Sequence, residues 1–487
     1  MLPELIDYEI KDIPQQSEIR TEEVEPMNPA TVNTRNFKFK VSNTGFLDGT
    51  SMITFKLKKS ATATAGDRLR VNLWNGGLGS IKSAVMKVGD FEIVNTQGLD
   101  RIATLRHMNK PQATRNDLLG FYLGNNLNVH VDPVKGSAND QGGDASIGQI
   151  RPTGDSGIFF GRQDNGAGAL VRNLSITTNA ALNEKYGIPL YMLFPCLENR
   201  QLPLFLFQDY PVILEIEFNE CSAYVNNVAN YAGQYASNDT DILIDSPKLV
   251  VDYVLPPTSV INSYLSQTAA QGYRFEYPKI NRVIKTLPAG SDNVVQEVEH
   301  RLGQEGREIH KIYQIKRYGS GDDPLKGALG KKILLDQTID GGMIEEYNLE
   351  INGRDVFHDY IYNNASQYNK ISMTLDEGKL YCPRSMFYTD VNSQWAAISN
   401  QTAGLRGNWK PLAIDLRNGN DSIVGGGTPV MRGSQVVFKY RRECKQDLND
   451  VTLDSRQSMD VEYHIVRDGT AIIKKLNSGG TSVIVSA

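Results

Sequence analysis

The residues of this sequence whose spacing best suits chemistry are the carboxylates of the segment Glu215-x-Glu217-x-x-Glu220. Because side chains alternate along a β-strand, Glu215 and Glu217 share one face if this segment is extended. Retaining glycoside hydrolysis needs two carboxyl groups about 5 to 5.5 Å apart. Sugar clefts also use aromatic platforms, and none of the three tryptophans lies beside this segment: Trp74, Trp395 and Trp409. We interpret the carboxylates as solvent-exposed or intersubunit groups, with carbohydrate binding or hydrolysis as the alternative.

Other motifs for catalysis or cofactor binding are missing. The Gly-rich strings 75–79 and 425–428 lack the G-x-x-x-x-G-K-[ST] pattern, and no G-x-S-x-G string occurs. None of the histidines forms an H-E-x-x-H or H-x-E pairing, and the cysteines show no C-x-x-C spacing. These residues are His107, His130, His300, His310, His358 and His464, and Cys196, Cys221, Cys382 and Cys444. The sequence therefore predicts no enzyme, no cofactor, no metal and no catalytic residue.

The charge balance bears on partners and on location. The 51 basic and 56 acidic residues leave a net charge of -5, which argues against a protein that mainly neutralises nucleic-acid phosphates. One basic stretch leaves open an inner surface that faces nucleic acid, against a role in solubility or in intersubunit salt links: His300, Arg301, Arg307, His310, Lys311, Lys316 and Arg317. The N-terminus lacks a signal-peptide pattern and no run approaches 18 apolar residues, so we expect synthesis in a cytosol-like compartment, without secretion and without a membrane span.

The elements that position these residues are β-strands. Apolar and polar residues alternate around 37–41, 53–58, 68–73, 212–219 and 436–441, which predicts strands with one buried and one wet face. Basic side chains on the wet faces of the first three strands are interpreted as solvated rather than as a polyanion groove. Helical periodicity is confined to short pieces at 99–106, at 260–265 between a cap at Thr258 or Ser259 and Gly272, and at 355–362. Strands without crossover helices predict antiparallel sheets in an all-β sandwich or barrel.

The order of features occurs twice along the chain. Phe91-Glu92-Ile93 and Leu349-Glu350-Ile351 each precede a predicted helix, and Leu202-Pro203-Leu204 and Pro411-Leu412-Ala413-Ile414 each precede an alternating strand, at 212–218 and 434–441. Each half then has a cysteine, Cys221 or Cys444, and closes on Val251-Asp252-Tyr253 or Val461-Glu462-Tyr463. We predict an acidic N-terminal arm at 1–34, a first domain at 35–255, a helical linker at 256–272 and a second domain at 273–487.

The segments 198–208, 211–218 and 248–255 carry a resemblance to a known family. Their Leu-Pro-Leu string, Val/Ile-rich strand and closing strand before a short helix resemble the end of the first domain in double jelly-roll major capsid proteins of icosahedral double-stranded DNA viruses. Giant-virus members carry acidic and arginine residues where this chain has Pro256-Pro257-Thr258. This departure points away from giant viruses and toward smaller relatives such as virophages and polinton-like viruses, with a related nucleocytoplasmic virus lineage as the alternative.

The resemblance implies two tandem antiparallel jelly rolls with short helices in the loops. It also implies a structural, non-enzymatic role: a homotrimer whose six rolls form a pseudo-hexameric, hexon-like capsomer of an icosahedral shell. The implied partners are the chain itself, neighbouring capsomers, and penton and minor capsid or cement proteins. An internal membrane or packaged DNA is a further partner that the resemblance allows on the inner face. The implied location is the virion, and the acidic arm is expected to tie neighbouring capsomers.

Overall fold

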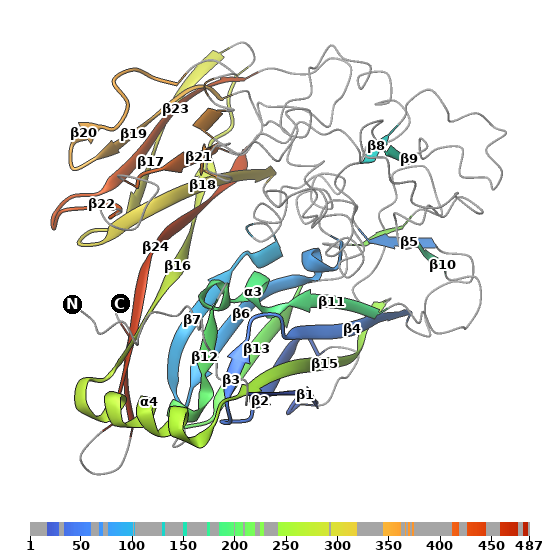
Figure 1. Cartoon of the computed structure of the whole chain (residues 1–487). Coiled ribbons are helices and arrows are strands. Elements are labelled where there is room, and N and C mark those ends of the chain that lie inside the picture. Colours follow the sequence, from blue (N-terminus) through green and yellow to red (C-terminus); the bar gives the residue numbers. More distant parts are fainter. Residues whose placement is uncertain are drawn as a thin grey trace.

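The computed structural model consists of two groups of β-strands joined by a helix (Figure 1). The residues that it describes are 17–28, 34–59, 68–71, 76–100, 102, 129–131, 150–152, 173–175, 185–198, 200–207, 210–219, 225–227, 242–291, 294–318, 344–361, 366, 369–370, 373–374, 412–417, 426–444, 458–475 and 481–485. No helix within this described part of the chain is both long and apolar enough to cross a membrane.

The first group is a sandwich of two antiparallel sheets. One sheet has the order β11-β4-β15-β3-β12 with β1 paired to β15, and the other has the order β2-β13-β6-β7. The bounds are β1 (Glu18–Val24), β2 (Asn36–Val41), β3 (Phe46–Asp48), β4 (Met52–Lys59), β6 (Ile81–Val88), β7 (Phe91–Gln97), β11 (Lys185–Pro189), β12 (Gln201–Pro203), β13 (Val212–Phe218) and β15 (Ile242–Leu255). Further elements are β5 (Arg68–Val71), β8 (Val129–Val131), β9 (Ile150–Pro152), β10 (Asn173–Ser175), β14 (Val225–Asn227), η2 (Gly76–Ser80), α3 (Leu190–Leu193), η5 (Pro195–Leu197) and η6 (Leu204–Phe207).

The second group follows the helix α4 (Thr258–Gln271) and is also a sandwich of two antiparallel sheets. One sheet has the order β16-β24-β18-β21, with β22 paired to β18 and β25 to β24, and the other has the order β17-β23-β19-β20. The bounds are β16 (Tyr273–Leu287), β17 (Val294–Gly303), β18 (Glu308–Tyr318), β19 (Ile344–Ile351), β20 (Arg354–Asp355), β21 (Leu412–Asp415), β22 (Thr428–Pro429), β23 (Val436–Cys444), β24 (Met459–Lys475) and β25 (Thr481–Val485).

The two groups repeat the same strand order. The sheet β2-β13-β6-β7 corresponds to β17-β23-β19-β20. In the other sheet β1, β11 and β15 correspond to β16, β21 and β24, while β3 and β4 together correspond to β18, and β12 corresponds to β22. The predicted internal repeat and the predicted all-β fold of tandem antiparallel sandwiches are therefore confirmed.

Two of the sequence matches behind that repeat are wrong. Residues 349–351 end β19, whose equivalent is β6, whereas the matched residues 91–93 lie on the next strand, β7. Likewise 202–203 belong to β12 but 412–414 belong to β21, the equivalent of β11. The structural marker is the two-residue hairpin after β6 and β19, where Gly89, Asn352 and Gly353 have positive φ. Short apolar-acid-apolar strings recur in many strands and do not fix the correspondence.

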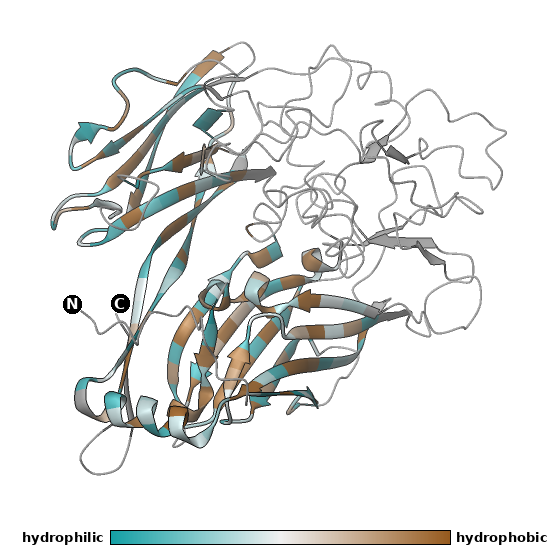
Figure 2. Ribbon diagram, in the orientation of Figure 1, coloured by the Kyte–Doolittle hydropathy of each residue, from teal (hydrophilic) through white to brown (hydrophobic). Residues whose placement is uncertain are grey.

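Hydrophobic and hydrophilic residues alternate along the strands of the first sandwich (Figure 2), and burial follows this alternation in β2 and β13. In β2 the residues Phe37, Phe39 and Val41 are buried and their neighbours are exposed, and in β13 alternate residues are buried. Facing sheets meet through aromatic rings: Phe55 on β4 packs edge-on against Phe218 on β13 at 5.1 Å between centroids. The predicted strands with one buried face at 37–41 and 212–219 are confirmed, whereas the burial of the segment 68–73 lies outside what the structure describes.

β16 and β24 span both sandwiches as one long ribbon (Figure 1). The start of β16 and the end of β24 pack into the first core through Tyr273, Phe275, Tyr277, Ala471 and Ile473. The opposite ends pack into the second core through Leu287, Val461, Tyr463 and Ile465. The two cores are therefore linked by continuous strands as well as by α4, which fixes how one sandwich continues into the other.

Of the three predicted helices, one is confirmed, one is wrong and one lies mostly outside the described residues. The predicted helix before Gly272 is confirmed as α4, but it begins at Thr258 with Pro257 as its N-cap, and not with the predicted cap at Thr258 or Ser259. The predicted helix at 355–362 is wrong, because Asn348 holds Phe357 through both backbone groups and Ile361 bridges to Tyr347 as a strand would. The prediction at 99–106 falls mostly outside the described residues.

Candidate functional site

The predicted carboxylates lie on the outer face of β13, the central strand of the first sandwich's β2-β13-β6-β7 sheet. Glu215 accepts from Lys38 on β2 at 3.1 Å and from Lys87 on β6 at 2.9 Å. Glu217 accepts from Lys82 at 2.7 Å and from Ser83 at 2.9 Å. Opposite charges on neighbouring strands stabilise a sheet, so these contacts are cross-strand ladders on its wet face.

The protonation of these carboxylates decides what they can do. Burial acts to raise the pKa of Glu215, but hydrogen bonds and charge from Lys87 and Lys38 outweigh it and hold that pKa below its ordinary value. The pKa of Glu217 is lowered in the same way, with Lys82 and Ser83 outweighing burial. A retaining glycosidase needs one carboxyl group protonated as general acid. Neither side chain meets that need at neutral pH, and Glu220 and the three tryptophans lie outside the described residues.

The corresponding outer face of the second sandwich carries a ladder of the opposite sign. Arg441 on the central strand β23 contacts Glu297 on β17 and Glu346 on β19, each at 2.8 Å. Lys439, two residues earlier, contacts Glu350 at 2.5 Å and Asp355 at 3.1 Å. Hydrogen bonding by Glu350, partly offset by desolvation, raises the pKa of Lys439 above its ordinary value. Both sandwiches thus present a charged outer face built on equivalent strands.

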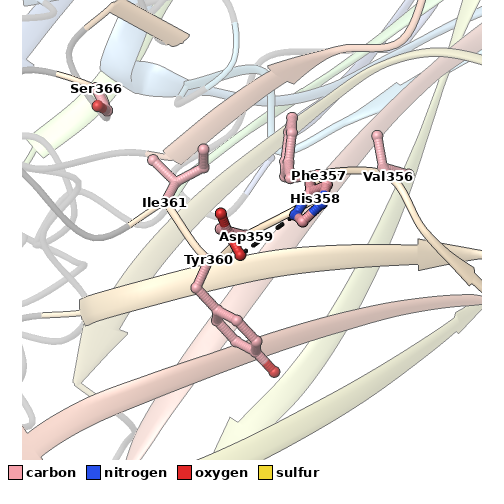
Figure 3. A pocket seen from close by; sticks show the side chains of 7 residues that line it. All are labelled: Val356, Phe357, His358, Asp359, Tyr360, Ile361 and Ser366. Carbon is pink, nitrogen blue, oxygen red and sulfur yellow. Dashed lines mark ion pairs between the residues drawn. The ribbon is translucent and has the colours of Figure 1, made fainter.

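A hollow of about 420 Å³ lies along the segment that follows β20 (Figure 3). It is lined by Val356, Phe357, His358, Asp359, Tyr360, Ile361 and Ser366. His358 Nδ1 and Asp359 Oδ1 are 3.4 Å apart, and their side chains are 98% and 88% exposed. Both side chains are in contact with bulk water, whereas binding pockets usually bury most of their ligand. The hollow therefore offers a polar surface contact and not an enclosed reaction site.

The histidines of the predicted basic stretch occupy unlike surroundings. His300 is buried, its Nδ1 lies 2.7 Å from the Tyr463 hydroxyl, and desolvation lowers its pKa to about 4. His310 Nε2 lies 3.0 Å from Asp468 Oδ2, and that hydrogen bond raises the pKa of His310. One histidine is thus neutral inside a core and the other is paired with a carboxylate.

The remaining members of that stretch are also dispersed. Lys311 donates to the carbonyl of Thr374 at 2.8 Å, and Arg307 shares the side-chain carbonyl of Asn281 with Arg467, each at 3.1 Å. Arg301 is on β17, while Lys316 and Arg317 are on β18. The members on β17 and on β18 belong to different sheets, and the inner-surface hypothesis for nucleic acid stays a prediction.

A buried polar cluster lies where β7 of the first sandwich meets the β16–β24 ribbon. Arg282 on β16 donates to both oxygens of Glu462 on β24 at 3.1 and 2.6 Å, and His464 Nε2 lies 3.5 Å from the same carboxylate. Glu462 and His464 are fully buried. In the sequence, Glu462 stands out only as part of the repeated Val-acid-Tyr string at 461–463. Its signal was an acidic residue inside an apolar strand, where an unpaired charge would be costly.

Gly98, just after β7, contacts this cluster and fixes how closely the sandwiches approach. Its φ is +65°, and a Cβ there would lie 2.8 Å from His464 Cε1. We expect Gly98→Ala to lower the free energy of unfolding by about 2 to 3 kcal/mol, through backbone strain and steric clash together. Gly353→Ala is the matched control, because Gly353 has φ +72° and nothing within 4 Å of its Cβ position. It should cost only about 1 kcal/mol of strain. Equal losses in chemical unfolding of both variants would contradict the close contact.

No metal centre is evident in the described part of the chain, where no three His, Cys, Asp or Glu side chains gather. Cys196 is buried, and burial raises the pKa of its thiol to about 12, so it is not a reactive thiolate. The described ion pairs discussed above lie on two outer faces and at the joint between the sandwiches.

Two sandwiches with one repeated strand order define a tandem jelly-roll fold. No protein-family model and no curated protein matches the sequence. Solved structures do match. A PBCV-1 protein fitted into a cryo-EM reconstruction of the virophage Sputnik has a TM-score of 0.56 at 9% identity, over 97% of this chain and 98% of that chain.

Two further solved structures agree. The Sputnik virophage structure has a TM-score of 0.55 at 12% identity, over 96% of this chain and 88% of that one. The PBCV-1 virus capsid has a TM-score of 0.54 at 11% identity, over 97% and 98%. The chain thus has the double jelly-roll fold of viral major capsid proteins. PBCV-1 and Sputnik match about equally well, so an origin among the smaller viruses stays a prediction.

Proposed function

We propose that this chain is a structural major capsid protein that forms homotrimers, which tile an icosahedral virus shell as pseudo-hexameric capsomers. The observation that carries the proposal is the match in fold to proteins of two virus particles over 96 to 97% of the chain. A match of that extent leaves little of the chain for an added catalytic domain.

The physical form of the molecule suits this role. Jelly rolls leave few open sheet edges and present rigid walls, while loops can vary without unfolding the scaffold. Two rolls of the same strand order in one chain allow a threefold assembly to approximate sixfold packing. Contacts between unlike surfaces of neighbouring copies then close into a ring.

A purely structural role is part of the proposal. The lowered pKa values of Glu215 and Glu217 support it against the alternative of a carbohydrate-hydrolysing β-sandwich. Carbohydrate binding without hydrolysis stays the runner-up. A screen for glycan binding and glycoside cleavage tests these alternatives, with Glu215→Gln as the comparison. Cleavage that Glu215→Gln abolishes would favour a hydrolase, and glycan binding without cleavage would favour a carbohydrate-binding protein.

The first test is the mass of the purified protein in solution, measured by light scattering coupled to size exclusion. We expect a species near three times the 54.1 kDa chain mass, with larger assemblies at higher concentration. A monomer at every concentration would contradict the capsomer and make the glycan screen the next experiment.

The finer organisation belongs to the same proposal. The linker at 256–272 and the second domain at 273–487 are retained as boundaries, while the first domain, predicted at 35–255, is extended to include residues 18–24. Residues 18–24 of the acidic arm pair with β15 as β1, so we assign them to the first sandwich and leave the tie between capsomers to the rest of the arm. Penton and cement proteins, a membrane or DNA beneath the shell, and synthesis in the host cytosol complete the proposed setting.

A further inference from the structure

Three basic side chains gather where the β16–β24 ribbon passes between the two cores (Figure 1). Lys279 on β16 pairs directly with Arg467 on β24, so both side chains lie on one face of the sheet. Arg307 immediately precedes β18, the strand on the other side of β24. Asn281 on β16 joins the two arginines, because its side-chain oxygen accepts from each of them at 3.1 Å. We call these four residues the basic cluster.

The basic cluster lies between the two cores and is partly desolvated. Tyr277, two residues before Lys279, packs in the first core, and Ile309, which pairs with Arg467, packs in the second. Arg467 is only 4% exposed, whereas Lys279 and Arg307 are half-buried. A small ligand would therefore reach the cluster through Lys279 and Arg307, its more exposed charged members.

The basic cluster is not matched by carboxylates from the same strands. Asp468 follows Arg467 along β24 and so points to the opposite face of the sheet, where it contacts His310 at 3.0 Å. Within the described part of the chain, neither Lys279 nor Arg307 forms an ion pair with a carboxylate. Basic side chains on the outer faces described above do form such pairs. The cluster thus differs from the charge ladders of the two sandwiches.

The positive charges of the basic cluster act on one another. Desolvation lowers the pKa of Lys279, Arg467 and Arg307 lower it further, and Glu92 on β7 opposes the shift. Desolvation and Arg307 also lower the pKa of Arg467, against an opposing contribution from Tyr277. The shared amide oxygen accepts hydrogen bonds from both guanidinium groups but supplies no negative charge. Like charges in a desolvated place destabilise one another, so a bound anion would stabilise this arrangement.

We propose that the basic cluster is a binding site for a phosphate-type oxyanion. Guanidinium groups present planar forks of N–H donors that match phosphate oxygens, and a lysine adds a compact point charge. Hydrogen bonds between charged partners are about twice as strong as neutral ones, so the anion competes well with the neutral oxygen of Asn281. The ligand is free phosphate or a phosphate group of nucleic acid, which present the same oxygens to the site. This inference does not depend on the capsid role.

The test is a calorimetric titration of the full chain with inorganic phosphate at pH 7 and constant ionic strength. We expect saturable binding by the wild type. Binding by Arg307→Gln and by Lys279→Met should be weaker by about tenfold or more, because each variant loses one charge-assisted contact. Arg274→Gln is the matched control, since Arg274 lies on β16 and pairs with Glu276, with both side chains more than half exposed. It removes the same charge outside the cluster and should bind phosphate like the wild type.

Thermal unfolding separates a binding role from a structural one. Without phosphate, Arg307→Gln and Lys279→Met should not lower the unfolding midpoint, because each removes a charge that repels its neighbours. With phosphate, the wild type should gain more stability than either variant, because a ligand that binds only the folded chain stabilises it. Phosphate also stabilises proteins by exclusion from their surface, but this effect is common to all variants. Lower midpoints for both variants without phosphate would mean that the cations serve the fold, and would overturn the proposal.

A fluorescently labelled DNA duplex distinguishes the two sources of phosphate. Duplex binding that both cluster variants weaken, and that Arg274→Gln does not, would assign the site to nucleic acid. Binding of inorganic phosphate without binding of the duplex would assign it to the free ion. Failure of the wild type to bind inorganic phosphate, or equal binding by all three variants, would overturn the site. The mass of the assembly in solution tests the capsid role separately and is not expected to change with these results.

Discussion

Arg282→Met should lower the free energy of unfolding by about 3 to 5 kcal/mol, because it leaves a carboxylate buried without its main counter-charge. Glu462 has no exposed surface, and Arg282 donates to both of its oxygens. His464 remains 3.5 Å away but does not replace the bidentate contact. The measurement is chemical unfolding monitored by near-UV and far-UV signals, which also reports whether the two sandwiches still unfold together.

Two controls sharpen this prediction. Arg274→Met removes an ion pair on the same strand, Arg274 with Glu276 at 2.6 Å, whose side chains are more than half exposed. It should change stability by less than about 1 kcal/mol. Replacing both partners, Arg282→Met with Glu462→Leu, should recover most of the loss because no buried charge remains. A loss below about 1 kcal/mol for Arg282→Met alone would contradict the assignment of Glu462 as a charged group.

The cluster around Glu462 shows what the sequence could and could not predict. Alternation is local, so strands such as β2 and β13 follow from a few neighbouring residues. The partnership of Arg282 with Glu462 joins residues 180 positions apart, and only the pairing of β16 with β24 brings them together. A single sequence carries no signal for such register.

The misplaced helix at 355–362 has the same origin. Its apolar spacing fits a helix, yet Asn348 on β19 hydrogen-bonds the backbone of Phe357 and keeps that segment extended. Tertiary contact overrides local periodicity there. The opposite charge patterns on the outer faces of the two sandwiches could not be predicted either. The sequence matches β13 with β23 correctly, but the strands that pair with each of them are known only once the sheets are known.

The buried His300 makes the second sandwich sensitive to acid. Desolvation lowers its pKa from the ordinary 6.5 to about 4, with a smaller contribution from Lys285 and an opposing hydrogen bond at Thr286. Below pH 6.5 the unfolded chain binds a proton at His300 that the folded chain does not yet bind. Stability is therefore complete above pH 6.5 and falls as the pH drops toward 4, by up to about 3 kcal/mol.

The geometry explains why the proton is excluded. Gln314 donates to the Tyr463 hydroxyl at 3.1 Å, which leaves the hydroxyl proton to point at His300 Nδ1, 2.7 Å away. A protonated ring would place a second hydrogen against that hydroxyl. We expect His300→Gln to flatten the stability profile between pH 7 and pH 4, measured as unfolding free energy at each pH.

His310→Gln is the opposing control for this pH dependence. The hydrogen bond to Asp468 raises the pKa of His310, so its contribution to stability is present below pH 6.5 and is lost as the pH rises through its folded pKa. Removing it should steepen the loss of stability toward acid, whereas removing His300 should reduce it. The two variants should differ, because the pKa of His300 is lowered and that of His310 is raised. If both gave the same dependence of stability on pH, the acid sensitivity would arise from other groups.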